Sequence, residues 1–433
     1  MNNNLTTLIR NLGARRMASP LPLNLDPGDK IGNFTPDETR IRYSVETGGL
    51  FESTDLSFEK AGPRPQIFFD PARVRAAMVT CGGLCPGLNN VIRSAFRQLC
   101  NYGVSEVLGI RYGYRGLNPA FGLEPIRITD DLVDDIHRDG GTILGSSRGN
   151  QPVSVMVDFL QKRGINVLLA LGGDGTQRGA HAIADEAERR GLPIAVVGIP
   201  KTIDNDIQYV QRTFGFASAV DIARDVLMSA HAEARAYPNG VALVRLMGRD
   251  SGFIAAAATL ASQEVNFTLI PEVPFALEGE NGLLRHLEKR LAAKGHALIA
   301  VAEGAGQDLL REGPEVKDDS GNVLHKDIGL FLRGRMIDHF KRRNIELNLK
   351  YIDPSYIIRS VPANSEDAVI CDSYARNAVH AAMAGKTDVV IGFWNDYIHV
   401  PIAMATETRR KISPDSLLWN SVLSATGQHA GMI

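Results

Sequence analysis

The sequence predicts an α/β protein made of two doubly wound lobes and an N-terminal extension. Three observations support this fold class. Continuous apolar runs recur along the chain, glycine-rich turns follow several of them, and segments with apolar residues at helical spacing come next. Because 433 residues are too many for one hydrophobic core, we expect these strand-turn-helix units to divide between two lobes.

The composition is that of an ordinary soluble globular protein, with 44% hydrophobic and 22% charged residues. The formal charge of -2 gives no general field for capturing nucleic acid or an acidic membrane, although local basic residues could hold a small phosphate. No stretch approaches the roughly 20 apolar residues of a membrane span, and the N-terminus lacks the apolar core of a secretory signal. The four cysteines follow no metal-binding spacing, so we expect reduced structural thiols in a cytoplasmic protein.

Residues 1–72 have no sustained apolar period and are rich in Asn, Pro, Gly and charge. This segment is expected to be an N-terminal arm. It is either a solvated extension or a segment that clasps a neighbouring lobe or subunit, and the sequence leaves both open.

The first expected strand covers residues 74–80, followed by a glycine-rich turn at 81–87 and a helix over 88–99. Backbone N–H groups at such a turn, including that of Gly82, lie at the positive end of a helix and can bind phosphate oxygens. The spacing matches neither the P-loop nor the dinucleotide fingerprint, so a tight structural turn is the alternative. A further glycine-rich stretch at 140–149 contains Arg148 and Gly149 and could line the same cleft.

The central unit spans residues 164–207. A strand is expected over 167–171, a glycine turn follows, a helix starts at Thr176, and a second strand covers 194–199. The right-handed crossover of a βαβ unit would place Asp174 of the turn beside residues 201–206, beyond the carboxyl ends of neighbouring strands. Ligands bind at this position in open α/β sheets.

Carboxylates in this unit suggest acid-base and metal chemistry. Asp174 on its glycine turn is the residue we expect to hold Mg²⁺, through water molecules, with a loop-capping Asp as the alternative. Thr202, Asp204 and Asp206 alternate along the chain, so their side chains would point the same way in an extended loop. The alternative for either loop carboxylate is a purely structural hydrogen bond.

The second lobe repeats the pattern. A strand over 241–246 ends in Met247-Gly248-Arg249 and precedes a helix over 253–260, and Glu303 follows a strand over 296–302. Taken alone, Met247 could be packing, Arg249 a surface charge and Glu303 a strand-terminal ion pair. A last apolar strand is expected over 388–392.

Six motifs together resemble the 6-phosphofructokinase family, over residues 73 to about 395. They are Gly172-Gly173-Asp174-Gly175-Thr176, the segment 200–206, Met247-Gly248-Arg249, and the segments 271–275, 301–304 and 351–359. The pentapeptide alone also resembles nicotinamide nucleotide kinases and lipid kinases, but the later motifs oppose those families. The segments 58–64 and 67–71 further resemble a long-armed subgroup that includes plant and trypanosomatid enzymes.

The resemblance implies transfer of the γ-phosphoryl group of ATP to fructose 6-phosphate with Mg²⁺. It implies that Asp204 is the general base and that Lys201, Thr202 and Arg249 assist catalysis. The implied ATP-binding residues are Gly82, Arg148, Gly149, Gly173, Asp174, Gly175 and Thr176. The implied sugar-phosphate residues are Thr202, Ile203, Asp204, Met247, Gly248, Arg249, Glu303, Lys350, Tyr356 and Arg359.

Two positions bear on the phosphoryl donor, which is ATP or pyrophosphate in this family. Pyrophosphate-dependent members usually carry Asp at the position of Gly175, where a carboxylate would crowd and repel an α-phosphate. Lys201, in contrast, is typical of the pyrophosphate enzymes. The long-armed subgroup pairs this Gly with this Lys and uses ATP, so we expect ATP, with pyrophosphate as the alternative.

The expected nucleotide lobe comprises residues 73–215 and 357–400, and the expected sugar-phosphate lobe comprises 216–356 and 401–433, with the active site in the cleft between them. The resemblance implies an allosteric glycolytic kinase that forms a homotetramer or homodimer, with Lys350 reaching an adjacent subunit. Tyr356 and Gly240 replace the histidine and inter-subunit arginine of bacterial members, which puts those phosphate contacts in doubt. A catalytically silent sugar-phosphate regulator is the alternative from another class, but it would not need both Asp174 and Asp204.

Overall fold

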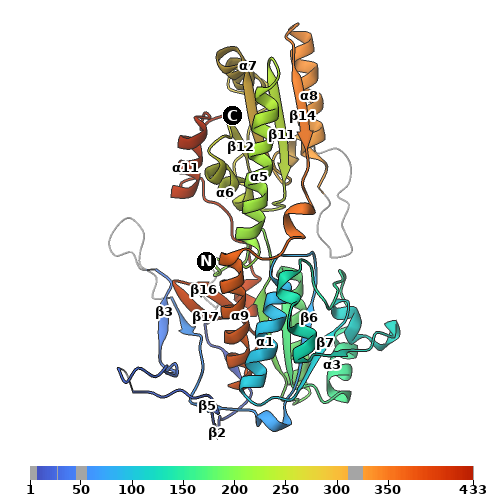
Figure 1. The fold of residues 1–433 in the computed structure, drawn as a ribbon, viewed down its shortest axis with the longest axis vertical. Coiled ribbons are helices and arrows are strands. Elements are labelled where there is room, and N and C mark those ends of the chain that lie inside the picture. The colour runs from blue at the N-terminus through green and yellow to red at the C-terminus, as the bar shows by residue number, and fades with distance from the viewer. Residues whose placement is uncertain (1–6, 27, 45–55, 311–324, 433) are drawn as a thin grey trace. The chain divides into compact units, whose positions relative to one another are not determined.

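The computed structural model describes residues 7–26, 28–44, 56–310 and 325–432, and it has the expected α/β fold class. The chain forms two compact units (Figure 1). Unit 1 comprises Met1–Thr202, Ile207–Gly215 and Val361–Arg409, and unit 2 comprises Ile203–Asp206, Phe216–Ser360 and Arg410–Ile433.

The described part of unit 1 contains a nine-stranded sheet, in the order β3-β4-β17-β16-β10-β9-β6-β7-β8. Its central strands β16, β10, β9, β6 and β7 are parallel, and the outer strands are antiparallel. The bounds are β3 Arg40–Arg42, β4 Ser57–Lys60, β6 Arg75–Thr80, β7 Glu106–Ile110, β8 Ile126–Arg127, β9 Val167–Gly172, β10 Ala195–Pro200, β16 Val389–Trp394 and β17 Asp396–Pro401.

The chain reverses its direction of travel across this sheet between β6 and β9. From β6 it passes through α1 (Leu88–Asn101) to β7 on one side, and later runs from β9 through α4 (Asp174–Arg189) to β10 on the other. Helix α9 (Ser365–Met383) packs beside α1, and α3 (Val153–Lys162) packs beside α4. The gap between β6 and β9 is therefore the topological switch point, where doubly wound sheets bind their ligands.

Strands β6, β9, β10 and β16 form close to where the sequence predicts them because their residues are apolar on both faces, whereas β7 was not predicted. All six residues of β9 and of β10 are buried, as expected for parallel strands covered by helices on each side. Helix α4 begins at Asp174, two residues before the expected start at Thr176. Its first turn is polar and glycine-rich, so apolar periodicity could not detect it.

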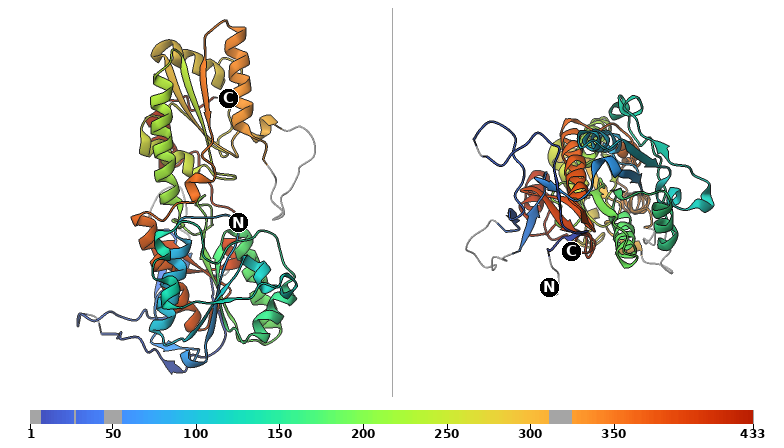
Figure 2. Two further views of the ribbon diagram at one scale, coloured as in Figure 1. Left: turned by 45° about the vertical axis from the view of Figure 1, so that its right-hand side comes forward. Right: turned by 90° about the horizontal axis from the view of Figure 1, so that it is seen from below.

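Unit 2 contains a four-stranded parallel sheet, in the order β12-β13-β11-β14, among its described residues. The strands are β11 Gly240–Leu246, β12 Phe267–Leu269, β13 His296–Ala302 and β14 Asn348–Ile352, and the helices are α5 Phe216–Arg235, α6 Phe253–Ser262, α7 Leu283–Lys294, α8 Ile328–Arg342 and α11 Leu417–Thr426. Helices α5 and α8 flank this sheet (Figures 1 and 2). Leucines of α7 and α8 pack with Val241 and Leu243 in one buried cluster.

The N-terminal arm is integrated into unit 1. Strands β3 and β4 extend the large sheet, β1 (Arg10–Asn11) pairs with β15 (Lys386–Thr387), and β2 (Met17–Ala18) pairs with β5 (Gln66–Ile67). The sequence left open whether the arm was solvated or clasped a neighbour. Its described residues clasp their own lobe, because their backbone groups complete sheets of that lobe.

The unit boundaries differ from the expected ones in three places. Residues 357–360 belong to unit 2, because the short 3-10 helix Ile357–Arg359 packs on α5. Residues 401–409 belong to unit 1, because α10 (Ile402–Ala405) continues from β17 and packs on α4. Residues Ile203–Asp206 belong to unit 2, where the Ser251 hydroxyl donates to the Asp204 carbonyl at 3.0 Å and the Arg410 amide donates to the Asp206 carbonyl at 2.8 Å.

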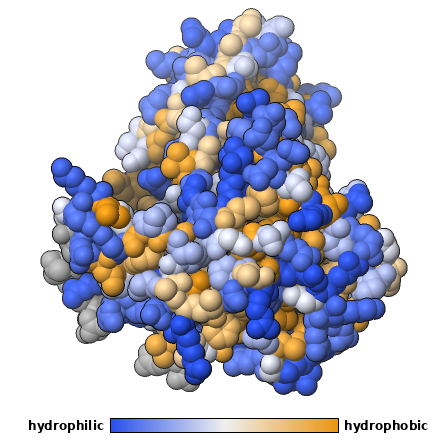
Figure 3. All heavy atoms as spheres, turned by 60° about the horizontal axis from the view of Figure 1, so that its bottom comes forward, coloured by the Kyte–Doolittle hydropathy of each residue, from blue (hydrophilic) through white to orange (hydrophobic). Residues whose placement is uncertain are grey.

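In the described part of the chain, none of the helices is both long and apolar enough to cross a bilayer. On the face drawn in Figure 3, hydrophobic residues lie in small patches among hydrophilic ones. Such mixed surfaces are usual for folded proteins in water.

Candidate active site

Three glycine-rich turns of unit 1 lie together at the switch point. The Cys81 amide, directly after β6, donates to the Leu171 carbonyl of β9 at 3.0 Å. The Gly82 amide donates to the Ser147 carbonyl at 3.0 Å, and the Ser146 hydroxyl donates to the Gly82 carbonyl at 2.5 Å. The turns at 81–87, 140–149 and 172–175 thus share one edge of the sheet.

Lys201 ties two of these turns to the end of β10. Its amide donates to the Gly172 carbonyl at 3.1 Å, and its ammonium donates to the Gly83 carbonyl at 2.5 Å. The side chain is buried, and a Cβ atom at Gly82 would lie 3.4 Å from its Nζ atom. The Lys201 ammonium therefore lies next to the 81–87 turn, where we expect phosphate oxygens to bind.

The start of α4 supplies the positive end of a helix dipole at the same edge. Gly173 is its N-cap, and Gly172 must lack a side chain because a Cβ atom there would lie 2.0 Å from the Thr176 hydroxyl oxygen. At Gly175, a Cβ atom would meet no described atom within 4 Å. Free N–H groups of a first helical turn next to open space form a site suited to phosphate groups.

Gln177 fixes the carboxyl ends of β9 and β10 relative to each other. Its fully buried amide nitrogen lies 3.0 Å from the Gly172 carbonyl, 3.3 Å from that of Ile199 and 3.4 Å from that of Ala170. Gly198 makes room for this side chain, since a Cβ atom there would lie 1.9 Å from its Oε1 atom. Gln177 could not be predicted from the sequence, because no local pattern marks this polar residue as buried.

Asp174 is flanked by two guanidinium groups. Arg178, one turn further along α4, lies 3.0 Å from its carboxylate, and Arg409 from the C-terminal segment lies 3.8 Å away. Arg409 is brought there by a bridge between its backbone and Ile207. The spacing of four residues could have suggested Arg178, whereas no local signal in the sequence points to Arg409.

Other residues expected at the nucleotide site vary in burial. Arg148 is exposed, and Gly149 beside it has a positive φ of 92°. Thr176 is buried, and its carbonyl accepts a hydrogen bond from the Tyr114 hydroxyl at 2.7 Å. Burial raises the pKa of the nearby Cys81 thiol to about 12, so this cysteine stays protonated and unreactive.

In unit 2, the loops after β11 and β13 approach each other closely. The Glu303 amide donates to the Leu246 carbonyl at 2.9 Å, and the Gly304 amide donates to the Gly248 carbonyl at 3.1 Å. Gly304 is required because a Cβ atom there would lie 1.8 Å from the Arg249 carbonyl oxygen. Met247, Gly248, Arg249 and Glu303 are thus held along one edge of the second sheet.

Glu303 forms an ion pair at the end of its strand, which was the alternative to a binding role. Arg245 lies 3.1 Å from its carboxylate and 2.7 Å from that of Asp353. Burial opposes the charge of Arg245, but these carboxylates and Asp327 outweigh it and raise the pKa of the guanidinium. Arg245 therefore orients the Glu303 side chain while leaving its second oxygen for other partners.

His325 lies near this group, although no local pattern in the sequence marks it as a site residue. Gln307 holds the adjacent residue, because its amide nitrogen lies 2.9 Å from the Glu303 carbonyl and 3.0 Å from the Lys326 carbonyl. Burial, assisted by the charge of Arg249, lowers the pKa of His325. A neutral imidazole thus lies beside the proposed sugar-phosphate residues.

The last expected residues fall in separate parts of unit 2. Tyr356 is 69% exposed, and the Arg359 guanidinium stacks 4.7 Å from the centre of its ring. Lys350 lies along β14 opposite Ala242, with its ammonium 4.5 Å from the centre of the Tyr237 ring. Ile203 is buried and Asn205 has a φ of 53°, so the loop containing Asp204 has a specific, non-extended backbone rather than the expected alternating one.

The fold is that of an α/β protein whose glycine-rich turns gather at the switch point of a doubly wound sheet, where such proteins bind phosphorylated ligands. Residues 75–382 match the sequence profile of the phosphofructokinase family. The chain therefore belongs to this family.

Similar proteins cover the chain almost completely. The ATP-dependent 6-phosphofructokinase of Borreliella burgdorferi is 49% identical over 444 residues, covering 100% of this chain and 98% of the relative. That of Amycolatopsis methanolica is 49% identical and covers 98% of this chain and 95% of the relative. ATP-dependent 6-phosphofructokinase 7 of Arabidopsis thaliana is also 49% identical, covering 86% of this chain and 77% of the relative.

Solved structures support the fold. A pyrophosphate-dependent phosphofructokinase from Marinobacter aquaeolei superimposes with a TM-score of 0.68 at 20% identity, covering 82% of this chain and 91% of that chain. Pichia pastoris phosphofructokinase in the T-state gives a TM-score of 0.65 at 21% identity, covering 83% of this chain and 37% of that chain. At these identities the likeness concerns the fold.

Proposed function

We propose that this protein is an ATP-dependent 6-phosphofructokinase, which converts ATP and fructose 6-phosphate to ADP and fructose 1,6-bisphosphate in glycolysis. The proposal is carried by the meeting of three glycine turns and the buried Lys201 at one switch point. Relatives of that name at 49% identity support it.

Asp204 is proposed to accept the proton of the attacking sugar hydroxyl, with Thr202 contacting the substrate. Lys201 and Arg249 would offset the charge that develops on the transferred group. A positioned base typically contributes 10²–10⁴-fold to rate, and electrostatic stabilisation a similar factor. Because Thr202 and Asp204 belong to different units, their joint action is part of the proposal.

Asp174 is proposed to hold Mg²⁺, mainly through water. Mg²⁺ keeps several waters and is usually bound by one or two carboxylates together with substrate phosphates, and a single carboxylate that is 21% exposed and lies beside open space fits this requirement. When bound, the ion would neutralise charge on the donor phosphates. The protein itself would orient the donor through Gly82, Arg148, Gly149, Gly173, Gly175 and Thr176.

The sugar phosphate is proposed to bind to unit 2. Arg245 orients Glu303 for hydrogen bonds with sugar hydroxyls, and Arg249 lies in the adjoining loop. Tyr356 and Arg359 would hold the 6-phosphate. Lys350 lies 3.9 Å from Glu233 of α5 and over the Tyr237 ring of its own chain. Its proposed role towards an adjacent subunit of a cytoplasmic homotetramer or homodimer rests on the family resemblance and would require it to leave these partners.

Pyrophosphate as donor is the second candidate, and Lys201 is the observation that favours it. The space beside Gly175 favours ATP, because a whole nucleoside triphosphate needs that room. The purified protein should be offered each donor separately, with fructose 6-phosphate and MgCl₂. Turnover with ATP but not pyrophosphate is expected, and turnover with pyrophosphate alone would reject ATP as donor.

The same assay should be run on Asp204→Asn, which keeps the shape of the side chain but removes its basicity. We expect kcat to fall at least about 100-fold with little change in fructose 6-phosphate affinity. As a control, Asp225→Asn changes an exposed carboxylate of α5. If both variants retain full turnover, Asp204 is not the base.

A further inference from the structure

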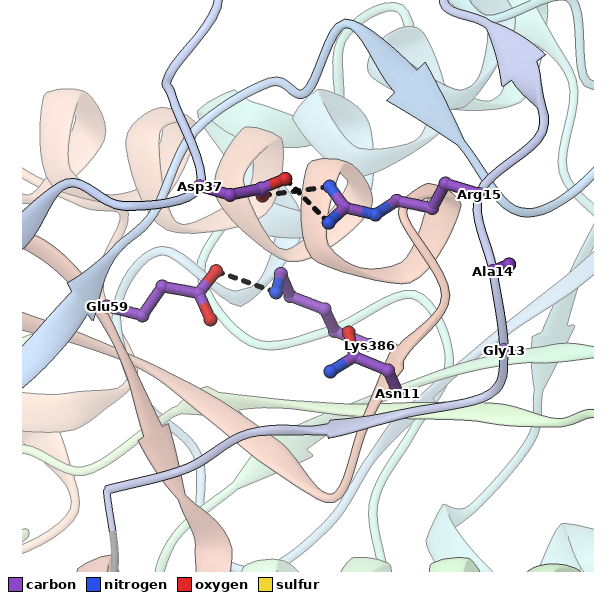
Figure 4. A pocket seen from close by; sticks show the side chains of 7 residues that line it. All are labelled: Asn11, Gly13, Ala14, Arg15, Asp37, Glu59 and Lys386. Carbon is purple, nitrogen blue, oxygen red and sulfur yellow. Dashed lines mark hydrogen bonds and ion pairs between the residues drawn. The ribbon is translucent and has the colours of Figure 1, made fainter.

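A cavity of about 380 Å³ lies between the N-terminal arm and β15 in unit 1 (Figure 4). Its walls include Asn11, Gly13 and Arg15 from the arm, and Lys386 from β15. The volume falls within the roughly 300–1,000 Å³ of typical small-molecule sites. The cavity is thus large enough for a small metabolite.

The charged side chains around this cavity form a chain of ion pairs. Lys386 is 3% exposed and lies 2.6 Å from Glu59, and the fully buried Arg64 lies 2.7 Å from the same carboxylate and 2.9 Å from Asp37. Arg15 binds Asp37 through two contacts of 2.7 and 2.9 Å. Figure 4 shows the pairs Lys386–Glu59 and Arg15–Asp37 facing the same cavity.

The network has more cations than anions. Arg15, Arg64 and Lys386 carry three positive charges, whereas Asp37 and Glu59 carry two negative ones. His399 also contacts Glu59, at 3.2 Å, but burial lowers its pKa to about 4, so it adds no charge near pH 7. Within this group of described residues, one positive charge therefore exceeds the negative charges next to the cavity.

Burial makes that surplus charge costly. Burial together with repulsion from the two arginines lowers the pKa of Lys386 in spite of Glu59. Among the described residues, Glu59 is the partner recorded for the ammonium, which has three N–H donors. An anion in the cavity would gain hydrogen bonds and relieve the repulsion among the cations.

We propose that this cavity binds a phosphate-type oxyanion, either orthophosphate or a phosphomonoester. The donors facing it are the Lys386 ammonium, the Asn11 amide and the outer N–H groups of Arg15. Donors from several directions suit a tetrahedral oxyanion with several acceptor oxygens.

This site is separate from the proposed phosphoryl-transfer site. Lys386 precedes the amino end of β16, which runs parallel to β10, whereas Lys201 follows the carboxyl end of β10. A strand of this length places the two edges roughly 20 Å apart. Binding would crosslink the arm to the lobe that it clasps, and it does not depend on the proposed catalytic activity.

The test is calorimetric titration of the full-length protein with inorganic phosphate in a saturating non-hydrolysable MgATP analogue. Fructose 6-phosphate is left out because it is itself a phosphomonoester, and binding in this cavity is identified by the variants described below. We expect saturable binding that chloride at equal ionic strength does not reproduce. A parallel titration with glycerol 3-phosphate distinguishes a phosphomonoester site from one restricted to free phosphate. Absence of saturable binding by either probe would overturn the proposal.

The decisive variants change one charge at an exposed position. Asn11→Asp is isosteric and cancels the surplus charge, so phosphate should bind about tenfold more weakly or worse. Asn11→Ala is the matched control, because it also loses the hydrogen bond from Asn11 to the Ile9 carbonyl but adds no charge. Arg15→Gln should weaken binding like Asn11→Asp.

Equal phosphate affinity in Asn11→Asp and Asn11→Ala would refute an electrostatic site in this cavity. Phosphate should also raise the melting temperature of the wild-type protein more than that of Asn11→Asp. If the donor assay fails while these differences remain, only the proposed function is rejected.

Discussion

A single methyl group at Gly198 should destabilise unit 1 and disturb the proposed catalytic edge. Gly198 lies in β10, and a Cβ atom there would lie 1.9 Å from Oε1 and 2.9 Å from Cδ of Gln177, and 3.2 Å from Cβ of Val390. Both neighbouring side chains are fully buried. Gly198→Ala must therefore displace the Gln177 amide from between β9 and β10.

The expected cost follows from these contacts. Overpacking of a tight core costs about 1–3 kcal/mol. Gln177 can donate two hydrogen bonds to the strand carbonyls that it contacts, and losing them costs about 1 kcal/mol each. We therefore expect the free energy of unfolding of unit 1 to fall by about 3–5 kcal/mol.

Urea unfolding followed by circular dichroism measures this loss, with Gly175→Ala as the matched control. A Cβ atom at Gly175 meets no described atom within 4 Å, and alanine in a helix is favoured over glycine by up to about 1 kcal/mol. The control should be as stable as the wild type or slightly more stable. If Gly198→Ala lies within about 1 kcal/mol of the control, Gln177 does not hold the two strands as described.

Three further predictions concern charge. Asp174→Asn should lower kcat at least about 100-fold but change the free energy of unfolding by less than about 1 kcal/mol, because its ion pairs are partly exposed; a large stability loss in urea would contradict this. Arg409→Gln should raise the KM for ATP several-fold without raising that for fructose 6-phosphate, and an unchanged KM for ATP would make the contact with Asp174 incidental. Burial lowers the pKa of His380 from 6.5 to about 3, so the unfolded chain binds the additional proton and stability falls as pH drops from 6.5 towards 3. His380→Gln should reduce the difference in unfolding free energy between pH 7 and pH 5 by about 2 kcal/mol, and an unchanged difference would show that His380 is not buried in its neutral form.

Much of the fold could be predicted because it rests on local patterns. Buried parallel strands are apolar runs, and glycine is needed where turns approach other atoms closely, as at Gly172 and Gly304. A few consecutive residues are enough to specify each of these features. The family resemblance extended them to named residues of a candidate site, whose roles remain predictions.

The tertiary structure decided what depends on residues far apart in the chain. Asp174 meets Arg409, Gln177 reaches the end of β10, and the arm completes the sheets of its own lobe only because strand order brings them together. The surplus charge at Lys386 likewise arises from arm and sheet residues that no local pattern connects. Sequence by itself determined six buried parallel strands, the glycine turns and the family, since short-range sterics and hydrophobicity specify them. Burial and pairing between distant segments, including the strands of the arm, depend on topology and were decided only by the folded chain.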